Sequence, residues 1–165
     1  MRGDGEGSAR LRFRLPFPRF VPLLLCLFVL SGCSLPRFII LDDPLTPEEH
    51  INLGVAYERS GKLESAIKEY ELASKRMPVA YLYLGNAYQQ LNRPREAEKY
   101  YRKSIKKAPA AADAYNNLAW LFYTGRDRLH EAEALALKAV ELDPAREDYR
   151  DTLNKIRELR AKNGL

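Results

Sequence analysis

Cysteine and histidine are scarce in this chain of 165 residues, which contains two of each. His50 and His130 stand far apart, and neither belongs to a recurring pattern of Cys, His, Asp and Glu with the spacing of a metal site. The sequence also contains no glycine-rich phosphate loop and no nucleophile paired with a base. We therefore expect a protein that is not an enzyme and that binds no metal or cofactor.

Long apolar runs are also missing, since the most extended one, Phe20 to Leu30, has eleven residues. As a helix it would span roughly 16 Å, about half of the hydrocarbon core of a bilayer, so it does not predict a permanent transmembrane helix. Arginines precede the run, and no acidic residue lies between Glu6 and its start. A basic segment followed by a short apolar stretch is typical of a secretory signal peptide, which we assign to residues 1–32.

Leu30-Ser31-Gly32-Cys33 follows at the end of this run. An aliphatic residue, two small residues and a cysteine in this order resemble the bacterial lipobox. The resemblance implies cleavage before Cys33 and lipidation of its thiol, with acyl groups such as palmitate. Two or three acyl chains anchor a protein durably, because each buried methylene contributes about 0.8 kcal/mol. The alternative is an ordinary thiol at the end of an uncleaved signal anchor.

The mature chain would begin with a lipidated cysteine and a tether, residues 33–45. Cys26 would leave with the signal, so the mature chain could form no internal disulfide. In enteric lipoproteins an aspartate after the cysteine favours the inner membrane, so Ser34 favours the periplasmic face of the outer membrane. Prolines in the tether predict an extended segment that reaches roughly 45 Å when fully stretched. Its apolar stretch, Phe38 to Leu41, could pack on the following domain, contact a partner or lie at the membrane.

The net charge of +5 does not predict a nucleic-acid-binding protein. Residues 1–32 carry five arginines and two acidic residues, so +3 of this charge belongs to the expected signal. In the remainder, basic and acidic side chains alternate, as in Lys68-Glu69. Such alternation is typical of solvated helix faces and not of a stripe that follows phosphates.

An internal repeat occupies the chain from about residue 46. Leu53-Gly54-Val55-Ala56-Tyr57 returns as Leu84-Gly85-Asn86-Ala87-Tyr88 and, with changes, as Leu118-Ala119-Trp120-Leu121-Phe122. Further recurring positions hold Ala66, Ala97 and Ala132, then Tyr70, Tyr101 and Ala136, and finally Pro78, Pro109 and Pro144. These positions resemble the signature of the tetratricopeptide repeat, a pair of antiparallel helices. The alanines allow close helix crossings, and the tyrosines fill the space beside them.

The resemblance implies an all-α fold, an α-solenoid of three helix pairs plus a C-terminal capping helix over residues 46–165. A capping box formed by Thr46 and Glu49 marks the first helix start. Gly61 and Asn92 fall in the turns within the first two pairs and favour left-handed backbone. Gly125 lies near the third such turn, which the insertion around Arg126-Asp127-Arg128 lengthens. The pattern predicts helices at 47–59, 63–76, 79–91, 94–107, 111–124, 129–141 and 145–162.

Two departures from the family pattern concern the first repeat. His50 occupies the place of Tyr81 and Tyr115, which predicts a less tightly closed first pair. The first and second repeats are 31 residues apart where the family usually has 34, which requires a short connection at 78–80. We expect this short connection to change the local superhelical twist.

Tetratricopeptide repeats present the first helix of each pair on a concave groove, and the resemblance assigns groove positions here. Among these positions are Ile51, Val55, Glu58, Arg59 and Thr124. The residues that we predict to bind a partner are Leu82, Asn86, Gln89, Gln90, Asn116, Trp120 and Tyr123. Amide side chains donate to and accept from a peptide backbone, and aromatic rings supply rigid contact area. Alternatively, Trp120 packs between helices and Asn116-Asn117 only stabilise adjacent repeats.

A clamp for acidic chain ends, of the chaperone-binding type, is not expected. Such a clamp needs Lys or Arg where Ile51, Val55, Leu82 and Asn116 stand. We therefore expect a membrane-anchored adaptor that binds a protein or peptide segment in the bacterial cell envelope, for example during assembly of a pilus or secretin. The alternatives are a docking factor for peptidoglycan enzymes and a structural lipoprotein that self-associates into a homo-oligomer.

Overall fold

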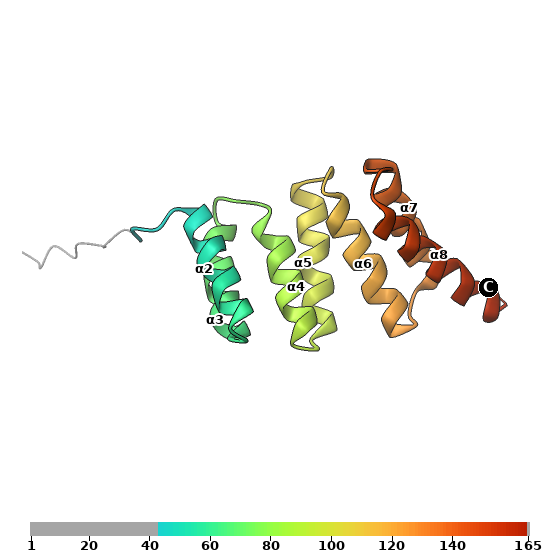
Figure 1. Ribbon diagram of the computed structural model, residues 1–165, viewed down its shortest axis with the longest axis horizontal. Helices are drawn as coiled ribbons and strands as arrows, with labels where there is room; N and C mark the ends of the chain where they lie inside the picture. Colours follow the sequence, from blue (N-terminus) through green and yellow to red (C-terminus); the bar gives the residue numbers. More distant parts are fainter. Residues whose placement is uncertain (1–42, 165) are drawn as a thin grey trace, which may run out of the picture. The chain divides into compact units, whose positions relative to one another are not determined.

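Seven helices and no strand make up the part of the chain that the computed structural model describes, residues 43–164 (Figure 1). The predicted boundaries agree with the helices to within two residues. Residues 1–42, which include the expected signal, Cys33 and Phe38 to Leu41, lie outside the described residues. The helices are α2 (Pro47–Arg59), α3 (Leu63–Ser74), α4 (Ala80–Gln90), α5 (Pro94–Lys107), α6 (Ala112–Gly125), α7 (Leu129–Leu142) and α8 (Glu147–Lys162).

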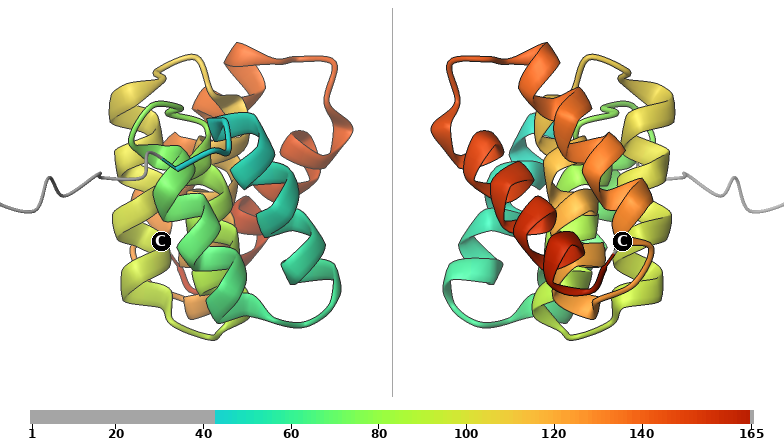
Figure 2. Two further views of the ribbon diagram at one scale, coloured as in Figure 1. Left: turned by 90° about the vertical axis from the view of Figure 1, so that its left-hand side faces the viewer. Right: turned by 90° about the vertical axis from the view of Figure 1, so that its right-hand side faces the viewer.

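The first six helices form three antiparallel pairs, α2 with α3, α4 with α5 and α6 with α7, and each pair packs against the next. The end views in Figure 2 show the pairs stacked one behind another, with α8 lying across the last pair. The predicted α-solenoid of three pairs plus a capping helix is therefore confirmed. None of the described helices has the length and apolar character needed to span a bilayer.

The start of α2 and the first two turns follow the sequence prediction. Thr46 Oγ1 accepts a hydrogen bond from the Glu49 amide at 3.2 Å, and Glu49 Oε2 accepts one from the Thr46 amide at 2.7 Å. Gly61 and Asn92 take left-handed backbone with φ of 73° and 55°. Each ends the first helix of its pair and lets the second helix return antiparallel.

The third turn is lengthened, as the insertion at Arg126-Asp127-Arg128 predicts. Gly125 is the last residue of α6, and the left-handed residues are Arg126 and Arg128, with φ of 51° and 46°. One inserted residue moves the turn beyond the glycine. Glu98 of α5 accepts two hydrogen bonds from the Arg128 guanidinium at 2.7 and 2.6 Å, which lowers the pKa of Glu98 to about 2. This charge-assisted pair fixes the lengthened turn against the second repeat.

Close contact between a glycine and a tyrosine ring sets the spacing within the first two pairs. A Cβ added to Gly54 would lie 2.3 Å from the Tyr70 ring, and one added to Gly85 would lie 2.3 Å from the Tyr101 ring. The third pair has Ala119 and Ala136 at the corresponding positions. A tyrosine therefore requires glycine opposite, whereas an alanine leaves room for a methyl group. Buried alanines at the helix crossings confirm the predicted close approach: Ala66, Ala97 and Ala132.

The first repeat is not loosened at His50, contrary to expectation. His50 is 5% exposed, compared with 8% for Tyr81 at the same place in the second repeat. Its Nδ1 lies 2.8 Å from Glu69 Oε2, and its Nε2 lies 3.1 Å from Asp43 Oδ2. Polar contacts on both sides of the imidazole therefore replace the packing of the usual aromatic ring.

Helix α8 covers the apolar end of the third pair, as predicted. Tyr149 is buried and donates a hydrogen bond to Asp113 Oδ1 at 2.6 Å. Leu153 and Ile156 pack into the same core as Leu118 and Phe122. The three buried clusters of residues 43–164 are joined through Tyr88 and Val55, and α8 covers their exposed end, so these residues hold their own core.

The contact between Gly85 and Tyr101 can be tested by mutation. Gly85→Ala should destabilise the domain by about 2 kcal/mol, because the new methyl group overlaps the tyrosine ring. In a Tyr101→Ala background the same change should instead stabilise by about 0.5–1 kcal/mol, since alanine is the better helix former. Urea unfolding of the four proteins of this double-mutant cycle measures the difference. Equal effects of Gly85→Ala in both backgrounds would show that the ring does not set the helix spacing.

Candidate functional site

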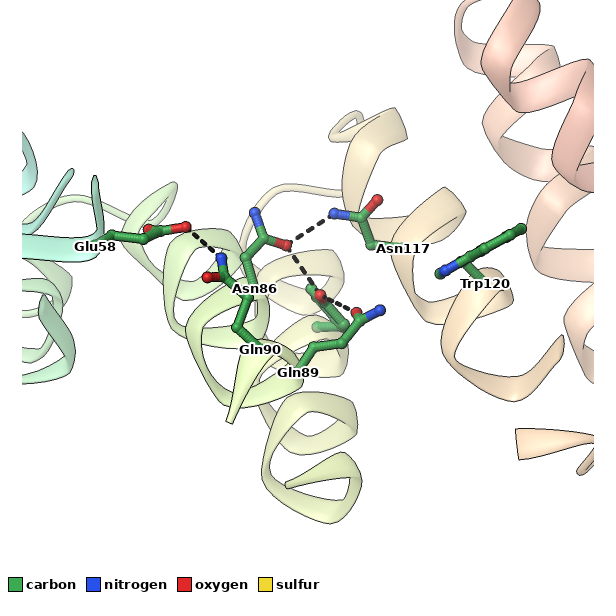
Figure 3. A pocket seen from close by; sticks show the side chains of 7 residues that line it. Glu58, Asn86, Gln89, Gln90, Asn117 and Trp120 are labelled. Carbon is green, nitrogen blue, oxygen red and sulfur yellow. Dashed lines mark hydrogen bonds between the residues drawn. The ribbon is translucent and has the colours of Figure 1, made fainter. Parts of the chain in front are cut away.

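Hollows lie along the first helices of the pairs, on the face where the groove is predicted. The central hollow has a volume of about 450 Å³ (Figure 3). A neighbouring hollow of about 390 Å³ shares Glu58, Asn86 and Gln90 with it, so the two form a continuous groove from α2 to α6. The central hollow is lined by Glu58, Asn86, Gln89, Gln90, Tyr101, Asn117 and Trp120.

Tyr101 reaches the groove from the second helix layer. Its ring passes Gly85, and its hydroxyl lies 2.9 Å from Asn86 Oδ1 and 2.7 Å from Gln89 Oε1. Burial raises the pKa of Tyr101, so the hydroxyl stays protonated and shares its one proton between these two oxygens. Asn117 of α6 donates to the same Asn86 oxygen at 2.9 Å. Asn86 therefore links α4 to both α5 and α6 (Figure 3).

Tyr70 occupies the equivalent position in the first repeat. Its ring lies against Gly54, and its hydroxyl donates to Glu58 Oε2 at 2.7 Å. Gln90 of α4 donates to the other oxygen of Glu58, which joins the first and second repeats across the groove (Figure 3). Burial and the bond to Glu58 raise the pKa of Tyr70. Both tyrosines thus close a helix pair and donate to polar side chains that line the groove.

Several polar groups of the groove keep hydrogen-bonding capacity. Asn86 and Gln89 use their side-chain oxygens in the network, while their NH₂ groups contact no acceptor within the described chain. Gln90 is exposed and donates to Glu58, which leaves its oxygen able to accept. The floor therefore offers both donors and acceptors to a bound chain.

Trp120 forms the aromatic end of the central hollow. Its side chain is half-buried, and its ring centroid lies 5.1 Å from that of Tyr123. The Lys155 ammonium of α8 lies 5.4 Å from the indole centroid, within range of a cation–π contact. Trp120 thus takes part in packing next to α8 and also lines the hollow.

The structure brings four of the seven predicted binding residues together: Asn86, Gln89, Gln90 and Trp120 line the central hollow. Leu82 packs against the core shared by the second and third repeats. Tyr123 lies against Trp120 without lining the central hollow. Asn116 has a buried Oδ1 without a hydrogen-bond partner in the described residues, and its neighbour Asn117 faces the hollow.

At two further residues the structure differs from the groove positions that the resemblance implied. Ile51, a groove position by resemblance, is buried with Ala73 and Ala80. Tyr101 lines the hollow although it belongs to a second helix, and the resemblance assigned the groove to first helices alone. In the sequence, Gly85 was the feature that could have indicated the close approach of the Tyr101 ring. Within residues 43–164 no cluster of three or more His, Cys, Asp or Glu could hold a metal ion.

The paired helices and their groove are features of a helical-repeat scaffold. Two family models, both described as tetratricopeptide repeat, match residues 50–76 and 82–147. Together the matched segments cover more than half of the chain. The chain therefore belongs to the tetratricopeptide-repeat family.

Solved structures agree with this assignment. One is the first repeat domain of Spaghetti (RPAP3) bound to the HSP90 peptide SRMEEVD, with a TM-score of 0.66 and 22% identity over 72% of this chain and 96% of that one. The NMR structure of the first such domain of human RPAP3 has a TM-score of 0.66 and 23% identity, over 73% and 96% of the two chains. At this identity the likeness establishes the fold. A search of curated proteins gave no significant match.

The two roles of the groove amides can be separated by mutation. Asn86→Ala should destabilise the domain by about 1–2 kcal/mol, because it deprives Tyr101 and Asn117 of a shared acceptor. Gln90→Ala, at an exposed site, should change stability by no more than about 0.5 kcal/mol. Chemical unfolding monitored by circular dichroism measures both. Similar losses for the two variants would contradict the assignment of Asn86 as the structural link.

Proposed function

We propose that this protein is a lipid-anchored adaptor of the bacterial cell envelope whose groove binds a segment of another protein. The observation that carries the proposal is the central hollow, where amide groups with free hydrogen-bonding capacity lie beside Trp120. A peptide backbone presents donors and acceptors in alternation, and asparagine and glutamine can satisfy both. The indole adds rigid contact area at a small entropic cost. An extended or helical segment suits such a surface.

The charges of the groove favour a segment with few acidic residues. Glu58 is the ionisable carboxylate of the central hollow, and no lysine or arginine lines that hollow. Arg59 lies in the neighbouring hollow. The peptide SRMEEVD seen with one structural neighbour is acidic at its end, and such a sequence would meet Glu58 without the basic clamp that would offset it. The segment that we propose as the ligand therefore differs in its charge from that peptide.

The anchor part of the proposal rests on the sequence Leu30-Ser31-Gly32-Cys33. Lipid at Cys33 would hold the repeats at a membrane surface, and Ser34 favours the periplasmic face of the outer membrane. Confinement raises the effective concentration of the groove near envelope proteins without any new contact. Assembly of a pilus or secretin and docking of peptidoglycan enzymes are processes in which such an adaptor would serve.

Site-specific photo-crosslinking in cells of the source organism tests the groove. A photo-reactive amino acid at Gln90, in the groove, should give a defined adduct with another protein, and Trp120→Ala should reduce its yield severalfold. The matched control is the same amino acid at Lys68, which is exposed on α3, and it should give no such adduct. An adduct with a second copy of the chain would favour self-association. No adduct from Gln90, or equal adducts from both sites, would contradict a binding groove.

A separate experiment tests the anchor. Cys33→Ser should abolish incorporation of labelled palmitate and release the protein from the membrane fraction, because no other thiol lies in the expected mature chain. Cys26→Ser, in the apolar run of the signal, is the matched control and should leave both properties unchanged. A Cys33→Ser protein that still carries label and sediments with membranes would show that this cysteine is not the anchor.

A further inference from the structure

The first described helix, α2, begins at one edge of the solenoid. In Figure 1 the start of α2 lies at the upper edge, together with the connections from α3 to α4, from α5 to α6 and from α7 to α8. The turns within the helix pairs lie at the opposite edge. We call the upper edge, formed by residues 43–47, 74–80, 106–112 and 142–147, the entry edge.

Two connections at the entry edge are basic. Lys75 and Arg76 follow α3, Lys106 and Lys107 end α5, and all four are exposed. None of the four forms an ion pair with another described residue. Residues 74–80 and 106–112 contain no acidic side chain. From Asp43 onward the chain has 21 basic and 19 acidic residues, so this cluster does not simply reflect an overall positive charge.

The flanking parts of the entry edge differ from these two connections. At the start of α2, Glu49 caps the helix and Asp43 contacts His50. At the start of α8, Arg146 pairs with Asp148. Asp143 accepts a hydrogen bond from the Ala145 amide, and the exposed Glu147 lies 4.0 Å from Arg150. Both flanks of the edge are therefore acidic in part, and its unpaired basic side chains are concentrated at the ends of α3 and α5.

Apolar side chains accompany the basic ones. Leu45 is 38% exposed and Val79 is 43% exposed, and these are two of the three large apolar side chains exposed in the described residues. Both belong to the entry edge, and Val79 stands three residues after Arg76. Exposed aliphatic groups next to unpaired lysine and arginine are typical of surfaces that lie at a lipid interface. A surface that bound only phosphate groups would not need exposed aliphatic side chains.

We propose that the entry edge, through Lys75, Arg76, Lys106 and Lys107, binds the anionic headgroups of a phospholipid membrane. The inference rests on the proposed anchor, because a tether from Cys33 reaches roughly 45 Å and joins the domain at this edge. When these four side chains contact headgroups, the entry edge is the part of the domain closest to the bilayer. The helices then stand upright on the membrane, and the groove opens sideways along it.

Flotation with vesicles tests the inference on residues 43–165, which hold their own core and lack the anchor. The fragment should bind vesicles of equimolar phosphatidylcholine and phosphatidylglycerol but not phosphatidylcholine alone. Replacing Lys75, Arg76, Lys106 and Lys107 with glutamine should lower the partition coefficient by about fivefold per residue at low salt. The matched control replaces Lys62, Lys68, Arg95 and Arg126, which are exposed away from the entry edge and lack ion pairs with described residues. This control removes the same charge and should retain most of the binding.

Three results would overturn the inference: no binding to the anionic vesicles, equal losses in the two fourfold variants, or preferential binding of a short DNA duplex through the same residues. Leu45→Ser with Val79→Ser should reduce the binding that persists at higher salt, and circular dichroism checks that each variant is folded. The fragment contains neither Cys33 nor the groove's partner. Failure of the vesicle experiment is therefore distinct from failure of the anchor experiment or of the groove experiment.

Discussion

The close approach of a glycine backbone to a tyrosine ring is the constraint on which the first two repeats depend. At Gly54 and Gly85 no side-chain atom fits, so the rings of Tyr70 and Tyr101 pass directly between the paired helices. Their hydroxyls donate to side chains that line the groove, Glu58, Asn86 and Gln89. The same side chain therefore determines the distance between two helices and the polarity of the surface above them. Packing and the chemistry of the groove cannot be varied independently at these positions.

The third repeat solves the packing problem differently, and the groove changes with it. Ala119 and Ala136 fill the space that a glycine and a tyrosine share elsewhere, so no hydroxyl reaches the floor there. Trp120 follows Ala119 as Asn86 follows Gly85, and an indole lies where the second repeat has an amide. The groove consequently has a polar part over the first two repeats and an aromatic end at the third. A segment bound along the groove would bind in one orientation, since the two ends of the groove differ in chemistry.

Local sequence signals predicted the fold. The site was harder to predict, because it depends on which of two adjacent residues faces the groove and on the position of a single insertion. Caps, turn residues and buried alanines lie close together in the sequence, so they mark helix ends and crossings without tertiary information. Asn116 and Asn117 differ by about 100° around their helix, and only the packing of α6 on α4 decides which one faces the hollow. The insertion after Gly125 moved the left-handed turn to Arg126 and Arg128. His50 is closed by Asp43 and Glu69, contacts that the repeat pattern does not encode.

Membrane contact and partner binding would use separate parts of the same helices. Helix α5 ends in Lys106 and Lys107 at the entry edge, while Tyr101, in its middle, contributes to the groove floor. Since the groove lies on a face of the solenoid and the basic side chains lie at helix ends, a lipid surface could contact the latter without covering the former. An anchor at Cys33 alone would not fix the direction in which the groove faces. Four charges at one edge would restrict this direction, and a domain already oriented loses less rotational freedom when its partner binds. Weak headgroup contacts would thus favour capture of an envelope protein without touching it.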